Sequence, residues 1–149
     1  MEKLRFTFAA GEDETELKQF LKTNDLLYQD IEKADLKHFL LVKDGADLVG
    51  MVGLQINAEC ALLRSLAVRQ DYRNRGIATL LVDKIEAYAR TLNIDRLYLL
   101  TMTAEEFFRK CDFQPADRQT APAGIQGTAE FKDLCPASAA FLMKGIATG

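Results

Sequence analysis

The sequence predicts an α/β protein with a mixed sheet, and three observations support this fold class. Segments with the two-residue period of strands alternate with segments that have the helical period. Asp44-Gly45 separates two β-rich runs within residues 38–56, a strong hairpin signal because glycine accepts the positive φ of the turn. The strongest helical pattern, residues 75–92, follows one apolar run and leads into another, so it predicts a helix between two buried strands.

The N-terminal part is predicted to be strand, helix and then hairpin. Residues 3–8 alternate like a strand, and residues 12–24 place Leu17, Phe20 and Leu21 on one helical face. A short helix is expected near residues 28–35. After the hairpin, residues 60–68 read as a further strand, which we expect at the centre of the sheet.

The long helix, 75–92, should bury one face and expose the other. Its predicted apolar face is Ile77, Leu81, Ile85, Tyr88 and Leu92, and its predicted solvent face is Asp83, Lys84, Glu86 and Arg90. The remaining predictions are a strand at 95–102, a helix at 104–111, the start of a strand at 113–118 and a last strand at 137–144. Residues 119–137 show no clear period, and so long a loop is usually functional or disordered.

Composition limits the possible functions. The chain has 149 residues and 48% hydrophobic content, which predicts one domain, 1–149. Its net charge of −3 and its dispersed bases argue against a nucleic-acid or membrane partner. It has no membrane span and no signal peptide, so a cytoplasmic location is expected. Three scattered cysteines and one histidine predict neither a disulfide framework nor a metal site.

One stretch, "VRQDYRNRGIATLL" (68–81), predicts an anion site. It leads from a strand into a helix, so the unpaired N–H groups of the first helical turn and the helix dipole face whatever lies above them. Gly76 and Ala78 allow a bulky group to approach the backbone, and Arg69, Arg73 and Arg75 add charged donors. The alternative is an ordinary strand-to-helix turn with solvated arginines.

The pattern Arg73-x-x-Gly76-x-Ala78 resembles the R/Q-x-x-G-x-G/A signature of the GNAT acetyltransferase superfamily, here with alanine at the third position. The following "DRLYLLTMTAEEFFRKCDFQPADR" resembles that family's next strand, helix and Gly-Phe turn, although Asp112-Phe113 stands at the turn. The resemblance covers residues 38–118. It implies a mostly antiparallel sheet of about six or seven strands with a central, splayed parallel pair, flanked by about four helices.

The resemblance also implies acetyl-CoA as co-substrate, with no metal. The turn would hold the pyrophosphate, and the strand before it would pair with the pantetheine arm. The implied cofactor-binding residues are Leu66, Ala67, Val68, Arg73, Asn74, Arg75, Gly76, Ile77, Ala78, Thr79, Thr103, Phe107 and Phe108. A homodimer is a further expectation, because GNAT domains often pair.

Two narrower resemblances concern the acceptor. Residues 96–117 and the "LMK" strand resemble the amino-acid N-acetyltransferases, and "FKDLCPASAAFLMK" resembles the small arsenic-resistance N-acetyltransferases. Both imply a small-molecule amine, namely an amino acid or an amino-acid-like compound. The alternatives are a protein or peptide N-acetyltransferase and a non-catalytic acyl-CoA-binding regulatory module.

Attack of an amine on a thioester requires an N–H donor for the oxyanion, a base and help for the leaving thiolate. The resemblance implies a strand bulge near Leu66 that turns its N–H toward the acetyl carbonyl, and places Phe108 where a tyrosine acid is usual. Thr101, Thr103, a water or unassisted departure of the thiolate would replace that acid. The candidate base is Glu59, which is otherwise a solvated strand-end residue. His38 and Tyr28 are weaker candidates.

Arg64 and Ser65 interrupt an otherwise apolar strand, where an unpaired guanidinium would be costly. Two partners for Arg64 remain open: a substrate carboxylate, which matches the guanidinium bidentately, or an internal salt bridge. Tyr28 and Phe131 complete the predicted substrate-binding set. The other loop residues that we expect to cover the substrate are Thr128, Lys132, Cys135 and Ser138.

Overall fold

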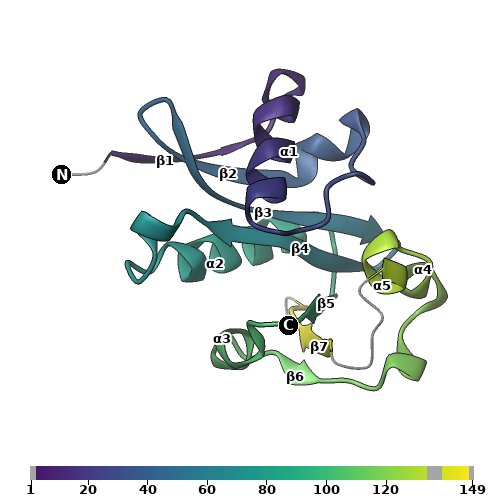
Figure 1. Ribbon diagram of the computed structural model, residues 1–149. Helices are drawn as coiled ribbons and strands as arrows, with labels where there is room; N and C mark the ends of the chain where they lie inside the picture. The colour runs from purple at the N-terminus through teal and green to yellow at the C-terminus, as the bar shows by residue number, and fades with distance from the viewer. Residues whose placement is uncertain (1–2, 134–138, 148–149) are drawn as a thin grey trace. The chain divides into compact units, whose positions relative to one another are not determined.

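The computed structural model describes residues 3–133 and 139–147 (Figure 1). Its strands are β1 (Leu4–Phe8), β2 (Phe39–Asp44), β3 (Asp47–Asn57), β4 (Cys60–Val68), β5 (Arg96–Thr101), β6 (Gln114–Pro115) and β7 (Ala140–Gly145). Its α-helices are α1 (Glu14–Thr23), α2 (Ile77–Thr91), α3 (Glu105–Lys110), α4 (Ala123–Gln126) and α5 (Ala129–Asp133). Its 3-10 helices are η1 (Gly11–Asp13), η2 (Lys33–His38), η3 (Gln70–Tyr72) and η4 (Arg118–Thr120).

The strands form a seven-stranded sheet in the order β1-β2-β3-β4-β5-β7-β6. The pairs β1/β2, β2/β3, β5/β7 and β6/β7 are antiparallel, whereas β4/β5 is parallel. The predicted mixed α/β fold class is therefore confirmed, as is the central position of the strand at residues 60–68.

The chain forms two compact units, and each is described by itself. Unit 1 is Met1–Leu54 with Ser65–Ile85, and unit 2 is Gln55–Arg64 with Glu86–Gly149. The single domain expected from the length of the chain stays a prediction. Within the described residues, no helix combines the length and the apolar character that a bilayer span requires.

The predicted hairpin is present in unit 1. β2 and β3 pair from Phe39↔Gly53 to Asp44↔Asp47, with a register shift between Val42 and Lys43. Gly45 in the turn has a φ of 63°, the left-handed conformation that glycine adopts without steric cost. The hairpin predicted from Asp44-Gly45 is therefore present for the reason expected, namely the positive φ of the glycine.

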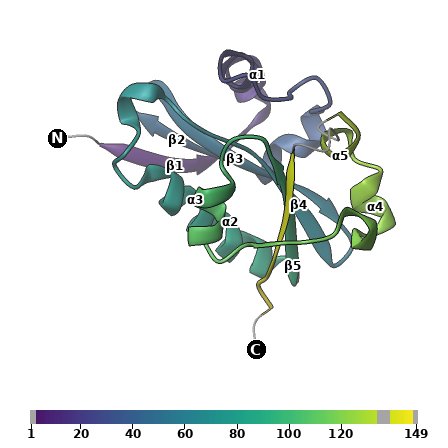
Figure 2. The ribbon, with the colours of Figure 1, turned by 60° about the horizontal axis from the view of Figure 1, so that its bottom comes forward.

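The first helix packs on one face of these strands. Leu17 and Leu21 of α1 are fully buried in a cluster with Leu41 and Met51, and Phe20 packs at its edge. On the opposite face, the start of α2 approaches the strands: a Cβ built on Gly50 would lie 3.4 Å from the Leu81 side chain. Neighbouring residues of a strand point to opposite faces, so α1 and the start of α2 cover the two faces of β2 and β3 (Figures 1 and 2).

Phe39 and Gly53 form a cross-strand pair that depends on the missing glycine side chain. A Cβ on Gly53 would lie 2.3–2.9 Å from ring atoms of Phe39, which is itself 1% exposed. Gly53→Ala should therefore lower the free energy of unfolding by about 1–3 kcal/mol through overpacking, as measured by urea denaturation. Gly11→Ala is the control, because a Cβ there has no atom within 4 Å. Equal stability of the two variants would contradict this packing account.

In unit 2, β5 pairs on one side with the first three residues of β4 and on the other side with β7. Cys60–Leu62 pair in parallel with Arg96–Tyr98, and the whole of β5 pairs with β7. The Tyr98 ring stacks on Phe141 with centroids 5.5 Å apart, and Phe131 of α5 meets Phe141 edge-on at 5.7 Å. The strands predicted at 95–102 and 137–144 are thus confirmed as β5 and β7, and the strand start at 113–118 is the short β6.

The helix expected near 28–35 is displaced toward the C-terminus. The structure has η2 at Lys33–His38 instead. The Asp35 carboxylate accepts the Glu32 N–H at 2.8 Å, and the Asp35 N–H donates to the Glu32 carbonyl at 2.9 Å. This cap fixes the start of the turn at Lys33, because Asp35 satisfies an N–H that otherwise has no partner at a helix start.

The predicted faces of the long helix were wrong at two positions. Glu86, expected in solvent, is only 4% exposed, whereas Leu92, expected in the core, is 37% exposed. The Glu86 carboxylate can be buried because Lys144 of β7 pairs with it: the Lys144 Nζ donates to both carboxylate oxygens, at 2.9 and 3.0 Å. Arg90 adds a contact at 3.6 Å to Glu86. α2 itself ends at Thr91, so Leu92 lies beyond the helical face.

The expectation of a featureless loop at 119–137 was also wrong for the described part. η4, α4 and α5 occupy much of residues 118–133, and α4 and α5 are neighbours. Each is about one turn long, too short to display an amphipathic period. Cys135 and Ser138, expected to cover the substrate, lie outside the described residues.

Candidate functional site

The turn between β4 and α2 presents backbone donors at the start of a helix. Asn74 and Gly76 both have left-handed backbones, with φ of 65° and 82°. The Leu80 N–H donates to the Gly76 carbonyl at 3.1 Å, so the amides of residues 77–79 precede this bond at the N-terminus of α2. A Cβ on Gly76 would have no atom within 4 Å. The space above the turn is therefore open to an anion.

Arg73 connects this turn to two other elements of unit 1. Its Nε donates to the Val68 carbonyl at 2.9 Å, and its Nη2 donates to the Asn24 side-chain oxygen at 3.4 Å. Arg73 is nevertheless exposed, so part of its guanidinium faces solvent at the turn. These contacts fix the direction of the side chain without burying its charge.

Arg69 and Arg75 are tied to one residue of η3. Arg69 binds the Asp71 carboxylate bidentately, through Nε at 2.7 Å and Nη2 at 3.0 Å. This hydrogen bond raises the pKa of Arg69 and lowers that of Asp71. The Arg75 Nη2 donates to the Asp71 backbone carbonyl at 2.8 Å. The arginines of the turn are thus ordered by contacts within unit 1.

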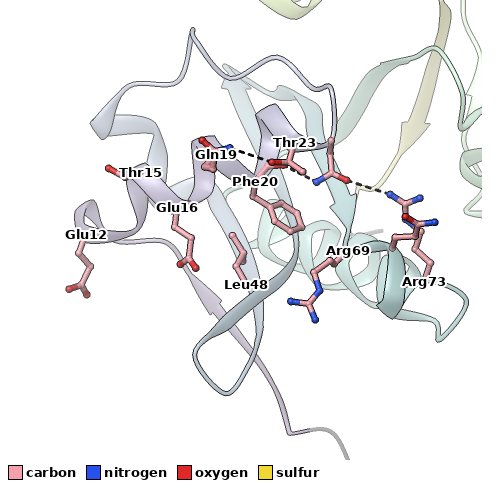
Figure 3. Close-up of a pocket in the computed structure, with 11 residues that line it drawn as sticks. Glu12, Thr15, Glu16, Gln19, Phe20, Thr23, Leu48, Arg69 and Arg73 are labelled. Carbon is pink, nitrogen blue, oxygen red and sulfur yellow. Dashed lines mark hydrogen bonds between the residues drawn. The ribbon is translucent and has the colours of Figure 1, made fainter.

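A cleft of about 860 Å³ adjoins Arg73 in unit 1 (Figure 3). One wall is the face of α1 and the residues just before it and after it, and the other is the segment after β4. The lining residues are Glu12, Thr15, Glu16, Gln19, Phe20, Thr23, Asn24, Leu48, Arg69, Gln70 and Arg73. Gln19 and Thr23 are joined by a hydrogen bond of 3.4 Å. The cleft has the size of a small-molecule site, with the carboxylates of Glu12 and Glu16 on one wall and the guanidiniums of Arg69 and Arg73 on the other.

The strand before the turn departs from regular geometry where the bulge was expected. Ser65 in β4 has a φ of 62°, which interrupts the extended backbone immediately before Leu66. Leu66 is partly exposed, whereas Ala67 and Val68 are each 8% exposed. Backbone donation from Leu66 to a substrate stays a prediction.

In unit 2, Arg64 has internal partners. Its Nη1 donates to the Gln55 side-chain oxygen at 3.3 Å, and its Nε lies 3.6 Å from Oε1 of Glu130 on α5. The side chains of Arg64 and Glu130 are 3% and 8% exposed. The structure thus contains the internal salt bridge, one of the two alternatives that the sequence left open. Phe131, the next residue, is buried in the core of unit 2.

The residues proposed near the sulfur lie around α3 of unit 2. Thr101 ends β5, and its Oγ1 accepts the Ala104 N–H at 2.9 Å, whereas Thr103 is exposed. Phe108 is 5% exposed and meets Phe113 edge-on at 5.7 Å. Phe107 is partly exposed and contacts Phe108 at 5.2 Å. Phe108 has no hydroxyl that could donate a proton to a thiolate. Its expected contact with the cofactor stays a prediction.

The candidate bases differ in environment. Glu59 is exposed in the turn between β3 and β4, which favours the alternative of a solvated strand-end residue. Burial, with a smaller effect of the Lys37 charge, lowers the pKa of His38, so its imidazole is neutral near pH 7. Tyr28 packs at the edge of the unit 1 core. Among the described residues, no group of three His, Cys, Asp or Glu side chains could hold a metal ion.

Sequence reasoning missed several residues of this region. The α1 face was assigned to the core alone, although its polar positions line the cleft, and Asn24 was not singled out as a partner of Arg73. Tyr72, within the quoted stretch, was not considered. The available signal was its position in the chain, because an aromatic ring between Arg69 and Arg73 can make cation–π contacts.

The sequence profile of the acetyltransferase (GNAT) family matches residues 4–113. The chain belongs to this GNAT family. The resemblance stated from residues 38–118 is therefore confirmed. An amino-acid acetyltransferase from Azotobacter vinelandii is 29% identical to the GNAT chain over 97 residues, which are 64% of this chain and 22% of that protein. The chain thus spans about a fifth of the length of such relatives.

Solved structures share the GNAT fold. N-acetylglutamate synthase from Neisseria gonorrhoeae, complexed with coenzyme A and N-acetyl-glutamate, matches with a TM-score of 0.84 at 18% identity, over 99% of this chain and 36% of that one. Rv2747 from Mycobacterium tuberculosis, in complex with CoA, matches with a TM-score of 0.78 at 21% identity, over 95% of this chain and 98% of that one. At these identities the likeness concerns the fold.

Proposed function

We propose that this GNAT protein transfers an acetyl group from acetyl-CoA to the primary amine of a small amino acid or amino-acid-like compound. The observation that carries the proposal is the Arg73–Ala78 turn. It combines open space at Gly76, the first amides of α2 and an exposed Arg73. A pyrophosphate matches this arrangement, because its oxygens accept from backbone amides and its charge is favoured by the helix dipole and the guanidinium.

The proposed reaction is direct. The amine nitrogen attacks the thioester carbon and its proton passes to a base or to water. The C–S bond then breaks, and the thiolate leaves as CoA after taking up a proton. We assign the oxyanion donor to the backbone N–H of Leu66, next to the left-handed Ser65. A thiol with a pKa of about 8.5 is a fair leaving group, so the proposed reaction tolerates the phenylalanine at position 108. Thr101 remains the proposed donor, because a hydroxyl that accepts a hydrogen bond can also donate one.

The cleft of unit 1 supports a small, polar acceptor. Glu12 and Glu16 on its wall would attract a protonated amine, and the hydroxyl and amide groups of Thr15, Gln19 and Thr23 suit a polar molecule. The amino-acid acetyltransferases among the relatives are consistent with this class of acceptor. We propose that the acceptor enters through this cleft.

A panel of acceptors tests the proposal. Wild-type protein is mixed with acetyl-CoA and with single free amino acids, amine-blocked amino acids or short peptides, and the release of thiol is followed. We expect release with at least one free amino acid, and none when its amine is blocked. Faster release with peptides than with every free amino acid would favour a protein N-acetyltransferase. CoA binding without release on any amine would favour the non-catalytic binding module.

A further inference from the structure

Two arginines of the phosphate turn lie over one aromatic ring, that of Tyr72. The guanidinium carbon of Arg69 lies 4.8 Å from the ring centroid, and that of Arg75 also lies at 4.8 Å. Both distances fall within the range of cation–π contacts. Two guanidiniums held beside one residue repel each other, and the negative face of the ring offsets part of that repulsion.

The ring is also fixed at its hydroxyl end. The Tyr72 hydroxyl donates a hydrogen bond to Oδ2 of Asp44, the last residue of β2. This bond, with burial as a smaller cause, raises the pKa of Tyr72, so the ring stays neutral at physiological pH. Asp71 also binds both guanidiniums, through its carboxylate to Arg69 and its backbone carbonyl to Arg75.

We propose that Tyr72 is a positioning residue for the phosphate turn: its ring, held by Asp44, keeps Arg69 and Arg75 ordered so that the turn meets the phosphates of CoA with its cations already in place. The inference rests on the proposed function. It assigns Tyr72 no contact with the reacting atoms.

The physical reason is conformational entropy. Arginine has a long side chain that loses much rotamer freedom when a ligand immobilises it. A guanidinium that is already stacked and hydrogen-bonded loses less of this freedom on binding, so more of its attraction for phosphate appears as affinity. The effect must depend on the phosphates of the ligand, and this dependence separates a positioning role from general support of the fold.

The test compares Tyr72→Leu with the wild type on two donors. We expect CoA to bind about tenfold more weakly to Tyr72→Leu in calorimetric titrations. The KM for S-acetyl-pantetheine, which lacks the nucleotide and its phosphates, should not change, and neither should the KM for the acceptor. Tyr72→Phe keeps the ring and should stay within about threefold of the wild-type affinity. Tyr88→Leu, the same substitution on α2 within unit 2, is the control and should bind CoA normally.

Each other outcome overturns the inference. Unchanged CoA affinity in folded Tyr72→Leu removes the positioning role. Equal losses with acetyl-CoA and S-acetyl-pantetheine indicate general damage to the fold. A loss in Tyr72→Phe as large as in Tyr72→Leu assigns the effect to the hydroxyl rather than to the ring. Failure of the wild type to bind CoA would instead overturn the proposed function, so the two failures are distinguishable.

Discussion

Gly76→Asp should abolish measurable binding of CoA while leaving the protein folded. The substitution places a carboxylate in the open space above the turn, where a pyrophosphate is proposed to lie. Like charges brought together in a binding site cost several kcal/mol, so the affinity should fall by at least about a hundredfold. The positive φ of 82° strains any L residue at this position, but aspartate is among the residues that adopt a positive φ most often, and the control variant carries the same strain.

Gly45→Asp is the matched control for this prediction. Gly45 also has a positive φ, 63°, and a Cβ there also has no atom within 4 Å. The same substitution in the hairpin turn therefore reproduces the backbone cost and the added charge beside Asp44, outside the open space above Gly76. Calorimetric titration should show CoA binding to Gly45→Asp and none to Gly76→Asp. Equal affinity of the two variants for CoA would contradict the assignment of the phosphate turn.

Glu130→Ala should cause the largest loss of stability. It removes the carboxylate whose Oε1 lies 3.6 Å from Nε of Arg64, a side chain that is 3% exposed in unit 2. Removing one partner of a buried ion pair typically costs about 3–5 kcal/mol, because the remaining charge is left in a poorly solvated site. For a chain of this size the melting temperature should fall by roughly 10 °C, as measured by circular dichroism.

Two further variants make this prediction specific. Glu105→Ala removes a partner of Arg109 in a surface pair, in which the Glu105 side chain is 45% exposed and the Arg109 side chain 52% exposed. It should change stability by no more than about 0.5 kcal/mol. The double variant Arg64→Met/Glu130→Leu replaces both charges and should recover most of the loss. A melting temperature of Glu130→Ala equal to that of the wild type would contradict the buried pair.

Arg64→Lys separates the two roles considered for Arg64. The internal pair predicts a lower melting temperature with little change in either KM, because lysine keeps the charge but loses the planar fork. A substrate carboxylate as partner predicts the reverse: a raised KM for the acceptor, an unchanged KM for acetyl-CoA and an unchanged melting temperature. The observed contact with Glu130 leads us to expect the first pattern.

Local signals in the sequence were sufficient for much of unit 1. The Asp44-Gly45 hairpin and the strand-to-helix turn at Gly76 depend on backbone conformations that glycine alone adopts easily, so residue type indicates them directly. The buried stripe of α1 follows from helical geometry, as Leu17 and Leu21 illustrate.

Features that depend on distant residues were not predictable. Glu86 fits a solvent-exposed helical position until Lys144, 58 residues along the chain, is brought to it. The partner of Arg64 could not be chosen from the sequence either, because Glu130 lies on a one-turn helix without a periodic signal. The cleft was missed for a similar reason: its polar α1 positions resemble an ordinary solvated face until the segment after β4 lies opposite them.

Transfer of an isotopically labelled acetyl group tests the central claim most directly. Wild-type protein is incubated with acetyl-CoA that carries a heavy-isotope acetyl group and with a mixture of free amino acids, and the small molecules are analysed by mass spectrometry. The account predicts the label in an amide of a small amine, formed by the wild type and not by Gly76→Asp. Recovery of the label entirely as intact thioester, under conditions where the wild type binds CoA, would contradict it.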